Sequence, residues 1–146
     1  MTKTTPAEPV DLIRLEGEGN SVVIRVTGRS AAGSATLTGE VVVDTAFVRG
    51  TLPTWIDPGD LDGWRETLDT LDGGQDAGWR EDGSGAELYI ELDPDGERAH
   101  VTVTDHAMSL TEVTATVTLT DEWFDEAYDR LDETLRTWPL DGALRG

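Results

Sequence analysis

Residues 113–138, VTATVTLTDEWFDEAYDRLDETLRTW, contain the clearest strand of the sequence and its clearest helix. Up to Leu119, apolar side chains alternate with threonines, which is the period of a strand buried on one face. Beyond Thr120, the apolar residues recur every three or four positions, which is the period of an amphipathic helix. Thr120 is a suitable N-cap, and Pro139 is a suitable stop. The stripe expected to be buried consists of Phe124, Ala127, Tyr128, Leu131, Leu135 and Trp138.

The same two periods recur along the rest of the chain. A first helix is expected to begin after an N-cap at Asp60 and to end at Gly73, with a stripe of three leucines and Trp64 on its buried side. Residues 36–49 form either one long strand or a bent pair with Phe47 on its apolar face, and residues 52–56 extend beyond it. Alternation predicts the remaining strands over residues 11–16, 21–27, 76–81, 87–92, 99–105 and 113–120.

These elements predict an α+β fold with the order βββ-α-ββββ-α. Each strand alternates on one face only, which is typical of antiparallel sheets with one face in water. The about seven strands therefore form either one curled antiparallel sheet or two packed sheets, with two helices on one side. The expected organisation is a flexible arm over residues 1–10, a single domain over 11–139 and a frayed tail over 140–146.

The composition is strongly acidic. The 146 residues include 30 acidic and 11 basic side chains and no cysteine, and the net charge at pH 7 is −19. This charge disfavours nucleic acids and anionic membranes as partners. Without cysteine there is no disulfide, thiol nucleophile or cysteine-based metal site. No apolar run reaches the roughly 20 residues of a membrane span, and the first residues do not resemble a signal peptide, so we expect a cytoplasmic protein.

No motif in the sequence carries an obvious chemistry. His100 and His106 lie about 20 Å apart if the strand between them is extended, too far to share a metal ion. No serine stands in a nucleophile elbow, and the one lysine, Lys3, lies in the expected arm. We therefore expect no catalytic, cofactor-binding or metal-binding residues, no cofactor and no enzymatic activity. One other hypothesis is a small hydrolase, and a pocket with a buried carboxylate beside either histidine would support it.

The two expected helices carry rows of acidic side chains away from their apolar stripes. Such rows indicate either a solvated face in an acidic protein or a docking surface for a basic partner. Tryptophan is favoured at binding hot spots, and three of the five tryptophans, Trp55, Trp79 and Trp123, stand off the stripes near a loop, a weak strand or the helix start. The candidate partner-binding residues are Asp62, Glu66, Asp69, Asp121, Asp125, Asp129, Asp132, Trp123 and Trp79.

The two expected helices and the strands between them show a recognisable sequence pattern. They are a helix with leucine and tryptophan that ends in glycine, a set of strands, and a helix opened by Asp-x-x-aromatic. This stretch, from Leu61 to Trp138, resembles small bacterial immunity proteins of the wall-associated, polymorphic-toxin type. The chain as a whole resembles an uncharacterised actinobacterial family of unknown function that opens with a Leu-Ile-Arg-Leu strand, residues 12–15 here. The positions that carry the immunity resemblance are Leu61, Trp64, Leu68, Leu71, Gly73, Leu88, Ile90, Val101, Val103, Asp121, Phe124, Leu131 and Leu135.

Two functions remain open at this point. The first is a small, non-catalytic binding protein that neutralises a basic protein partner, as the resemblance to immunity proteins implies. The second is a structural or accessory domain whose acidity reflects the composition of its proteome, and which pairs with a second copy through a sheet edge. The sequence does not set the oligomeric state.

Overall fold

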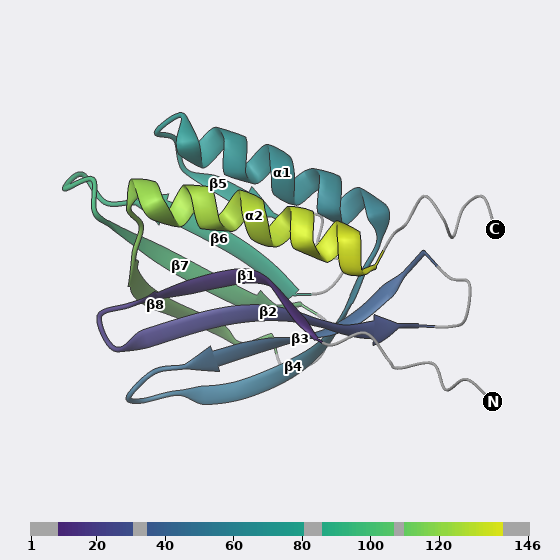
Figure 1. Ribbon diagram of the computed structural model, residues 1–146. Helices are drawn as coiled ribbons and strands as arrows, with labels where there is room; N and C mark the ends of the chain where they lie inside the picture. The colour runs from purple at the N-terminus through teal and green to yellow at the C-terminus, as the bar shows by residue number, and fades with distance from the viewer. Residues whose placement is uncertain (1–8, 31–34, 81–85, 107–109, 139–146) are drawn as a thin grey trace, which may run out of the picture.

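The computed structural model describes residues 9–30, 35–80, 86–106 and 110–138, which form two four-stranded antiparallel sheets and two helices (Figure 1). One helix follows each sheet along the chain, so the fold is α+β and consists of two successive ββββα units. The first unit comprises β1 (Val10–Gly17), β2 (Asn20–Arg29), β3 (Leu37–Asp44), β4 (Arg49–Ile56) and α1 (Pro58–Asp72). The second comprises β5 (Ala77–Trp79), β6 (Ala86–Leu92), β7 (Arg98–Asp105), β8 (Glu112–Thr118) and α2 (Asp121–Thr137).

The expected element order was wrong by one strand. The stretch over residues 36–49 turns at Thr45, whose hydroxyl accepts hydrogen bonds from the backbone N–H groups of Phe47 and Val48 at 3.1 and 2.7 Å. The chain then returns as β4, which pairs with β3 along its whole length. Phe47 consequently lies at the tip of a hairpin with 96% of its surface exposed, and the prediction that it faces inward was also wrong.

The helix starts follow the expected capping chemistry with one shift. At α2, the side chain of Thr120 accepts a hydrogen bond from the backbone N–H of Trp123 at 3.4 Å, so the predicted N-cap is confirmed. At α1, the N-cap is Asp57 and not Asp60, because Pro58 already occupies the first turn. Asp60 instead accepts a hydrogen bond from the backbone N–H of Asp57 at 3.0 Å. Pro139, the expected stop of α2, lies outside the described residues.

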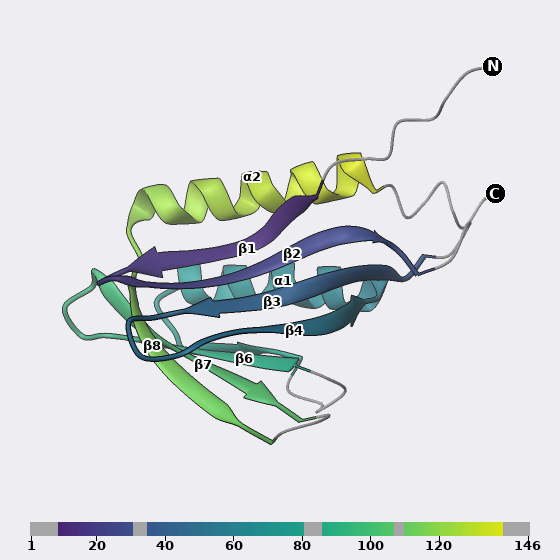
Figure 2. The ribbon, with the colours of Figure 1, turned by 90° about the horizontal axis from the view of Figure 1, so that it is seen from below.

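Both helices pack on the first strand of the other unit. The helix α1 lies on β5 (Figure 1), and α2 lies on β1, as the view from below shows (Figure 2). The buried side chains of both sheets and both helices then join in one hydrophobic core. Trp64 is fully buried within it, as expected, whereas Trp138 is only partly buried at the end of α2. Within the described residues, neither helix is both long enough and apolar enough to span a membrane.

The two sheets meet where the β1–β2 turn touches β8. The side-chain amide of Asn20 donates a hydrogen bond to the backbone carbonyl of Thr116 at 2.8 Å. Gly17 packs so closely on Thr118 that a Cβ atom would collide with it, and its backbone has a φ of 145°, which favours glycine. This close contact fixes one end of the first sheet against the second.

Gly39 offers a test of the packing inside the first sheet. A Cβ atom at this buried position would collide with the backbone carbonyl oxygen of Arg25 on β2, so we expect Gly39→Ala to lower the free energy of unfolding by about 2 kcal/mol. Gly50→Ala is the matched control, because a Cβ atom there meets nothing within 4 Å. Urea unfolding followed by tryptophan fluorescence measures both. Equal stabilities of the two variants would contradict the close approach of β2 and β3.

Candidate functional site

The two helices run antiparallel and side by side on one surface of the molecule (Figure 1). The hydroxyl of Tyr128 on α2 donates a hydrogen bond to Asp69 on α1 at 2.6 Å. Arg65 on α1 and Asp132 on α2 form an ion pair at 3.5 Å, with both side chains about half exposed. These two contacts bring together the acidic rows that the sequence predicts on separate helices.

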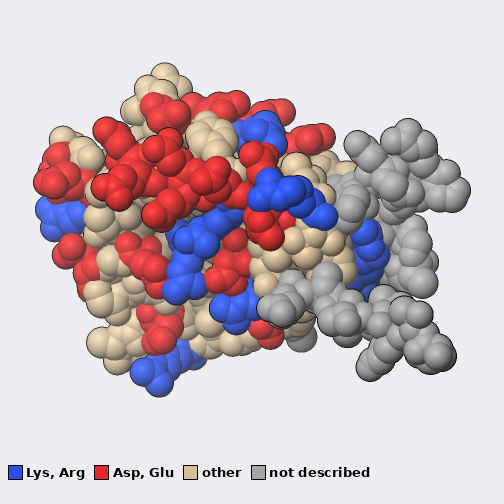
Figure 3. Space-filling model, viewed as in Figure 1, with Lys and Arg blue, Asp and Glu red and all other residues tan. Residues whose placement is uncertain are grey.

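The joined rows form a continuous acidic face. The helix α1 has five acidic side chains and one arginine, and α2 has seven acidic side chains and two arginines. Figure 3 shows the carboxylates gathered over the two helices. We call this surface the acidic face and define it by seven exposed residues, all of them predicted from the sequence: Asp62, Glu66, Asp69, Asp121, Asp125, Asp129 and Asp132.

The structure places the two candidate tryptophans differently. Trp123 is half-buried at the start of α2, where its indole N–H donates a hydrogen bond to the backbone carbonyl of Arg14 at 2.7 Å. Trp79 is only 2% exposed, packs edge-on against Trp64 and donates to the backbone carbonyl of Asp60 at 2.7 Å. Its N–H and ring are therefore used inside the fold, and we leave Trp79 out of the candidate surface.

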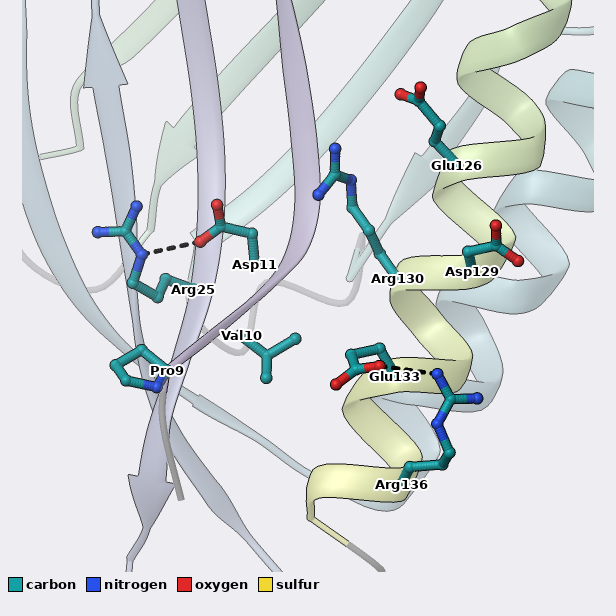
Figure 4. Close-up of a pocket in the computed structure, with 9 residues that line it drawn as sticks. All are labelled: Pro9, Val10, Asp11, Arg25, Glu126, Asp129, Arg130, Glu133 and Arg136. Carbon is teal, nitrogen blue, oxygen red and sulfur yellow. Dashed lines mark hydrogen bonds and ion pairs between the residues drawn. The ribbon is translucent and has the colours of Figure 1, made fainter. Parts of the chain in front are cut away.

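A cleft opens beside the acidic face, between α2 and the start of β1 (Figure 4). It has a volume of about 650 Å³ and is lined mainly by charged side chains. Two chain segments more than a hundred residues apart form its walls, so no local sequence pattern could have revealed it. We call it the β1–α2 cleft, and its charged residues are Asp11, Arg25, Glu126, Asp129, Arg130, Glu133 and Arg136.

Most of the charges in the β1–α2 cleft are paired. Asp11 accepts from the Nε–H of Arg25 at 2.8 Å and, through its other oxygen, from Arg14 at 2.8 Å. Glu133 pairs with Arg136 at 2.7 Å. The guanidinium of Arg130 makes no hydrogen bond or ion pair with any residue that the structure describes.

The histidines make separate contacts on the second sheet. His100 lies between the hydroxyl of Thr116 at 3.0 Å and the carboxylate of Asp93 at 3.1 Å. His106 lies 2.6 Å from Glu87. Neither histidine lines the β1–α2 cleft. Within residues 9–30, 35–80, 86–106 and 110–138, no three histidine or carboxylate side chains come together in a way that could hold a metal ion.

Residues 10–139 match the model of a family of unknown function, DUF5959. The chain belongs to this family. The match covers both ββββα units completely and confirms the expectation of an uncharacterised family. No curated protein matches the sequence. Membership of DUF5959 brings no activity with it, so the function has to be argued from the acidic face and the β1–α2 cleft.

The contact between Tyr128 and Asp69 gives the site a measurable pH signature. Burial, together with the hydrogen bond and negative charge of Asp69, raises the pKa of Tyr128 from 10.0 to about 12. Because the folded state holds this proton more tightly, the stabilisation is present below pH 10.0 and is lost as the pH rises through about 12.

We therefore expect a difference titration of tyrosinate absorbance, wild type minus Tyr128→Phe, to show a midpoint near 12. In the Asp69→Asn variant the midpoint should fall towards the ordinary value, because the charge of the acceptor is gone while the burial remains. A wild-type midpoint near 10.0 would contradict the contact that joins the two helices.

Proposed function

We propose that this DUF5959 protein is a non-catalytic binding protein whose acidic face holds a basic protein partner. The observation that carries the proposal is the antiparallel contact between α1 and α2, which joins two acidic rows into one surface. Twelve carboxylates against three arginines on these helices create a strongly negative potential. Such a surface attracts a basic partner over a distance and speeds its association at low salt.

The surface also contains features that could fix a partner once it has arrived. The half-buried ring of Trp123 packs edge-on against Phe124, with ring centroids 5.0 Å apart, at the N-terminal end of α2. Tryptophan is enriched among the residues that contribute most to binding energy at protein interfaces. The β1–α2 cleft at the side of α2 adds a concave region with charges of both signs.

The concrete form that we propose is an immunity-like protein of the cytoplasm that neutralises a basic toxin. The acidic face supports this form, and we interpret the sequence pattern from Leu61 to Trp138 as similar to that of small immunity proteins. A basic toxin such as a nuclease presents a positive substrate-binding surface, which an acidic protein can cover without any chemistry of its own.

Affinity capture tests the proposal directly. The full chain is used as bait in a lysate of its source cells at physiological salt, and retained proteins are identified by mass spectrometry before and after a high-salt wash. The proposal predicts a basic protein that is retained at physiological salt and released at high salt, because salt screens charges that lie far apart. Retention of acidic proteins alone, or of a partner that resists the wash, contradicts it.

Charge reversal on α2 should slow association with the captured partner. We expect the triple variant Asp125→Lys, Asp129→Lys and Asp132→Lys to lower the association rate constant about tenfold or more, with a smaller change in the dissociation rate. The matched control reverses three exposed acids on the strands, by Asp44→Lys, Glu91→Lys and Glu112→Lys. Stopped-flow fluorescence measures both, and equal slowing by the two triple variants would show that the acidic face does not guide the partner.

A second candidate function, self-association, is favoured by a different surface. An apolar cleft of about 210 Å³ lies between β3–β4 and β7–β8. Phe47 and Leu110, 96% and 75% exposed, each directly precede a residue that lines this cleft, Val48 and Thr111. Exposed apolar side chains thus lie beside an apolar recess in one patch, so two copies related by a two-fold axis could each fill the recess of the other.

Sedimentation velocity over a range of concentrations tests the second candidate. Self-association predicts a dimer for the wild type and a monomer for the double variant Phe47→Ser and Leu110→Ser. Trp55→Ser is the control, because Trp55 is a large exposed side chain, 55% accessible, that does not line the cleft. A wild-type chain that stays monomeric at every concentration contradicts this candidate.

A further inference from the structure

Arg130 differs from every other arginine that the structure describes. Nine arginines lie in the described residues, and eight of them contact a carboxylate, a hydroxyl group or an aromatic ring. The guanidinium of Arg130 has no such contact with a described residue, although Glu126 and Glu133 lie one helical turn before and after it.

The side chain of Arg130 points away from α2 into the β1–α2 cleft, towards β1 (Figure 4). It is half-buried there, so part of its hydration shell is already replaced by protein. Two further arginines line the same cleft and use only part of their donors. Arg25 uses its Nε–H on Asp11, and Arg136 uses one terminal nitrogen on Glu133. The cleft therefore offers several unused guanidinium N–H groups that can bind an oxyanion.

The other charges in the cleft restrict which anion fits. Four carboxylates, from Asp11, Glu126, Asp129 and Glu133, accompany the three arginines. A phosphate or another polyanion would be repelled by these four groups. A single carboxylate flanked by cationic groups suits both the arginines and the carboxylates of the cleft. Its oxygens can face Arg130 while the flanking cationic groups face the four carboxylates.

We propose that Arg130 receives the carboxylate of an aspartate or glutamate that stands between basic residues in the docking segment of the partner. This inference rests on the proposed function and adds its specificity: the acidic face attracts any basic segment, whereas the β1–α2 cleft selects one that also carries a carboxylate. Attraction by the acidic face and selection by the β1–α2 cleft predict opposite effects of Arg130→Gln on binding affinity. Loss of a positive charge strengthens binding to a purely basic segment, but it weakens binding to a segment whose carboxylate needs Arg130.

Two synthetic peptides with capped ends, equal in length and in net positive charge, serve as probes. In the first, one glutamate stands between lysines. In the second, glutamine replaces that glutamate and also one lysine, so that the net charge is unchanged. Isothermal titration of the full wild-type chain should give a Kd about fivefold to tenfold lower for the glutamate peptide, the effect of one charge-assisted guanidinium–carboxylate contact.

The variants separate this contact from general electrostatics. Arg130→Gln should abolish the preference for the glutamate peptide, and circular dichroism should show that the fold is retained, because the guanidinium has no hydrogen bond or ion pair with a described residue. Arg49→Gln is the matched control: it removes the same charge from an exposed arginine on β4, outside both the acidic face and the β1–α2 cleft, and it should keep the preference.

Equal binding of both peptides to the wild type would overturn the inference and leave the proposed function standing. The inference would also be overturned if Arg130→Gln and Arg49→Gln strengthened the binding of both peptides alike. If neither peptide bound at low salt, the proposed function and this inference would be overturned together. Competition by free glutamate, at the peptide's own concentration, would overturn the assignment to a peptide segment.

Discussion

The docking of α2 on β1 joins the end of the described chain to its beginning, and the candidate site depends on it. The apolar side of α2 contributes Ala127 and Leu131 to the core, both at most 4% exposed. At the start of the helix, the indole N–H of Trp123 satisfies the backbone carbonyl of Arg14 on β1 at 2.7 Å. Without the docking of α2 on β1, α2 would not lie beside α1, and neither the acidic face nor the β1–α2 cleft would exist.

The packing of α2 on β1 also holds two acidic helices side by side, although their like charges repel each other. Acidic side chains at successive turns destabilise a helix, and two such helices side by side add repulsion between them. The apolar side of α2, its Thr120 cap and the hydrogen bond between Tyr128 and Asp69 oppose this repulsion. The repulsion is therefore concentrated on the surface formed by the two helices.

Local periodicity was enough to predict most of the fold. The alternation in β6, β7 and β8 and the apolar stripes of both helices are confirmed. The β3–β4 hairpin was missed because its turn is made by the hydroxyl of Thr45 and not by the glycine or asparagine that usually marks a tight turn. The first cap was misplaced because Asp57 and Asp60 are both good capping residues, and Pro58 decides between them.

The site was predictable only in its parts. Helical spacing identified the acidic rows, because exposure on a helix follows from the position of its apolar stripe. Whether two rows meet depends on contacts between distant residues, such as Asp69 with Tyr128, which no local pattern encodes. For the same reason the burial of Trp79 and the β1–α2 cleft could not be foreseen: both arise when a helix of one unit packs on the first strand of the other.

The proposed function requires that α1 and α2 act together as one binding surface. Amide chemical-shift changes in a ¹⁵N-labelled chain, recorded as the captured basic partner is added, show which residues the partner touches. We expect changes along the exposed sides of both helices and at the β1–α2 cleft, all of them reduced by added salt. Changes confined to the strands around Phe47 and Leu110, or to one helix alone, would contradict a joint surface.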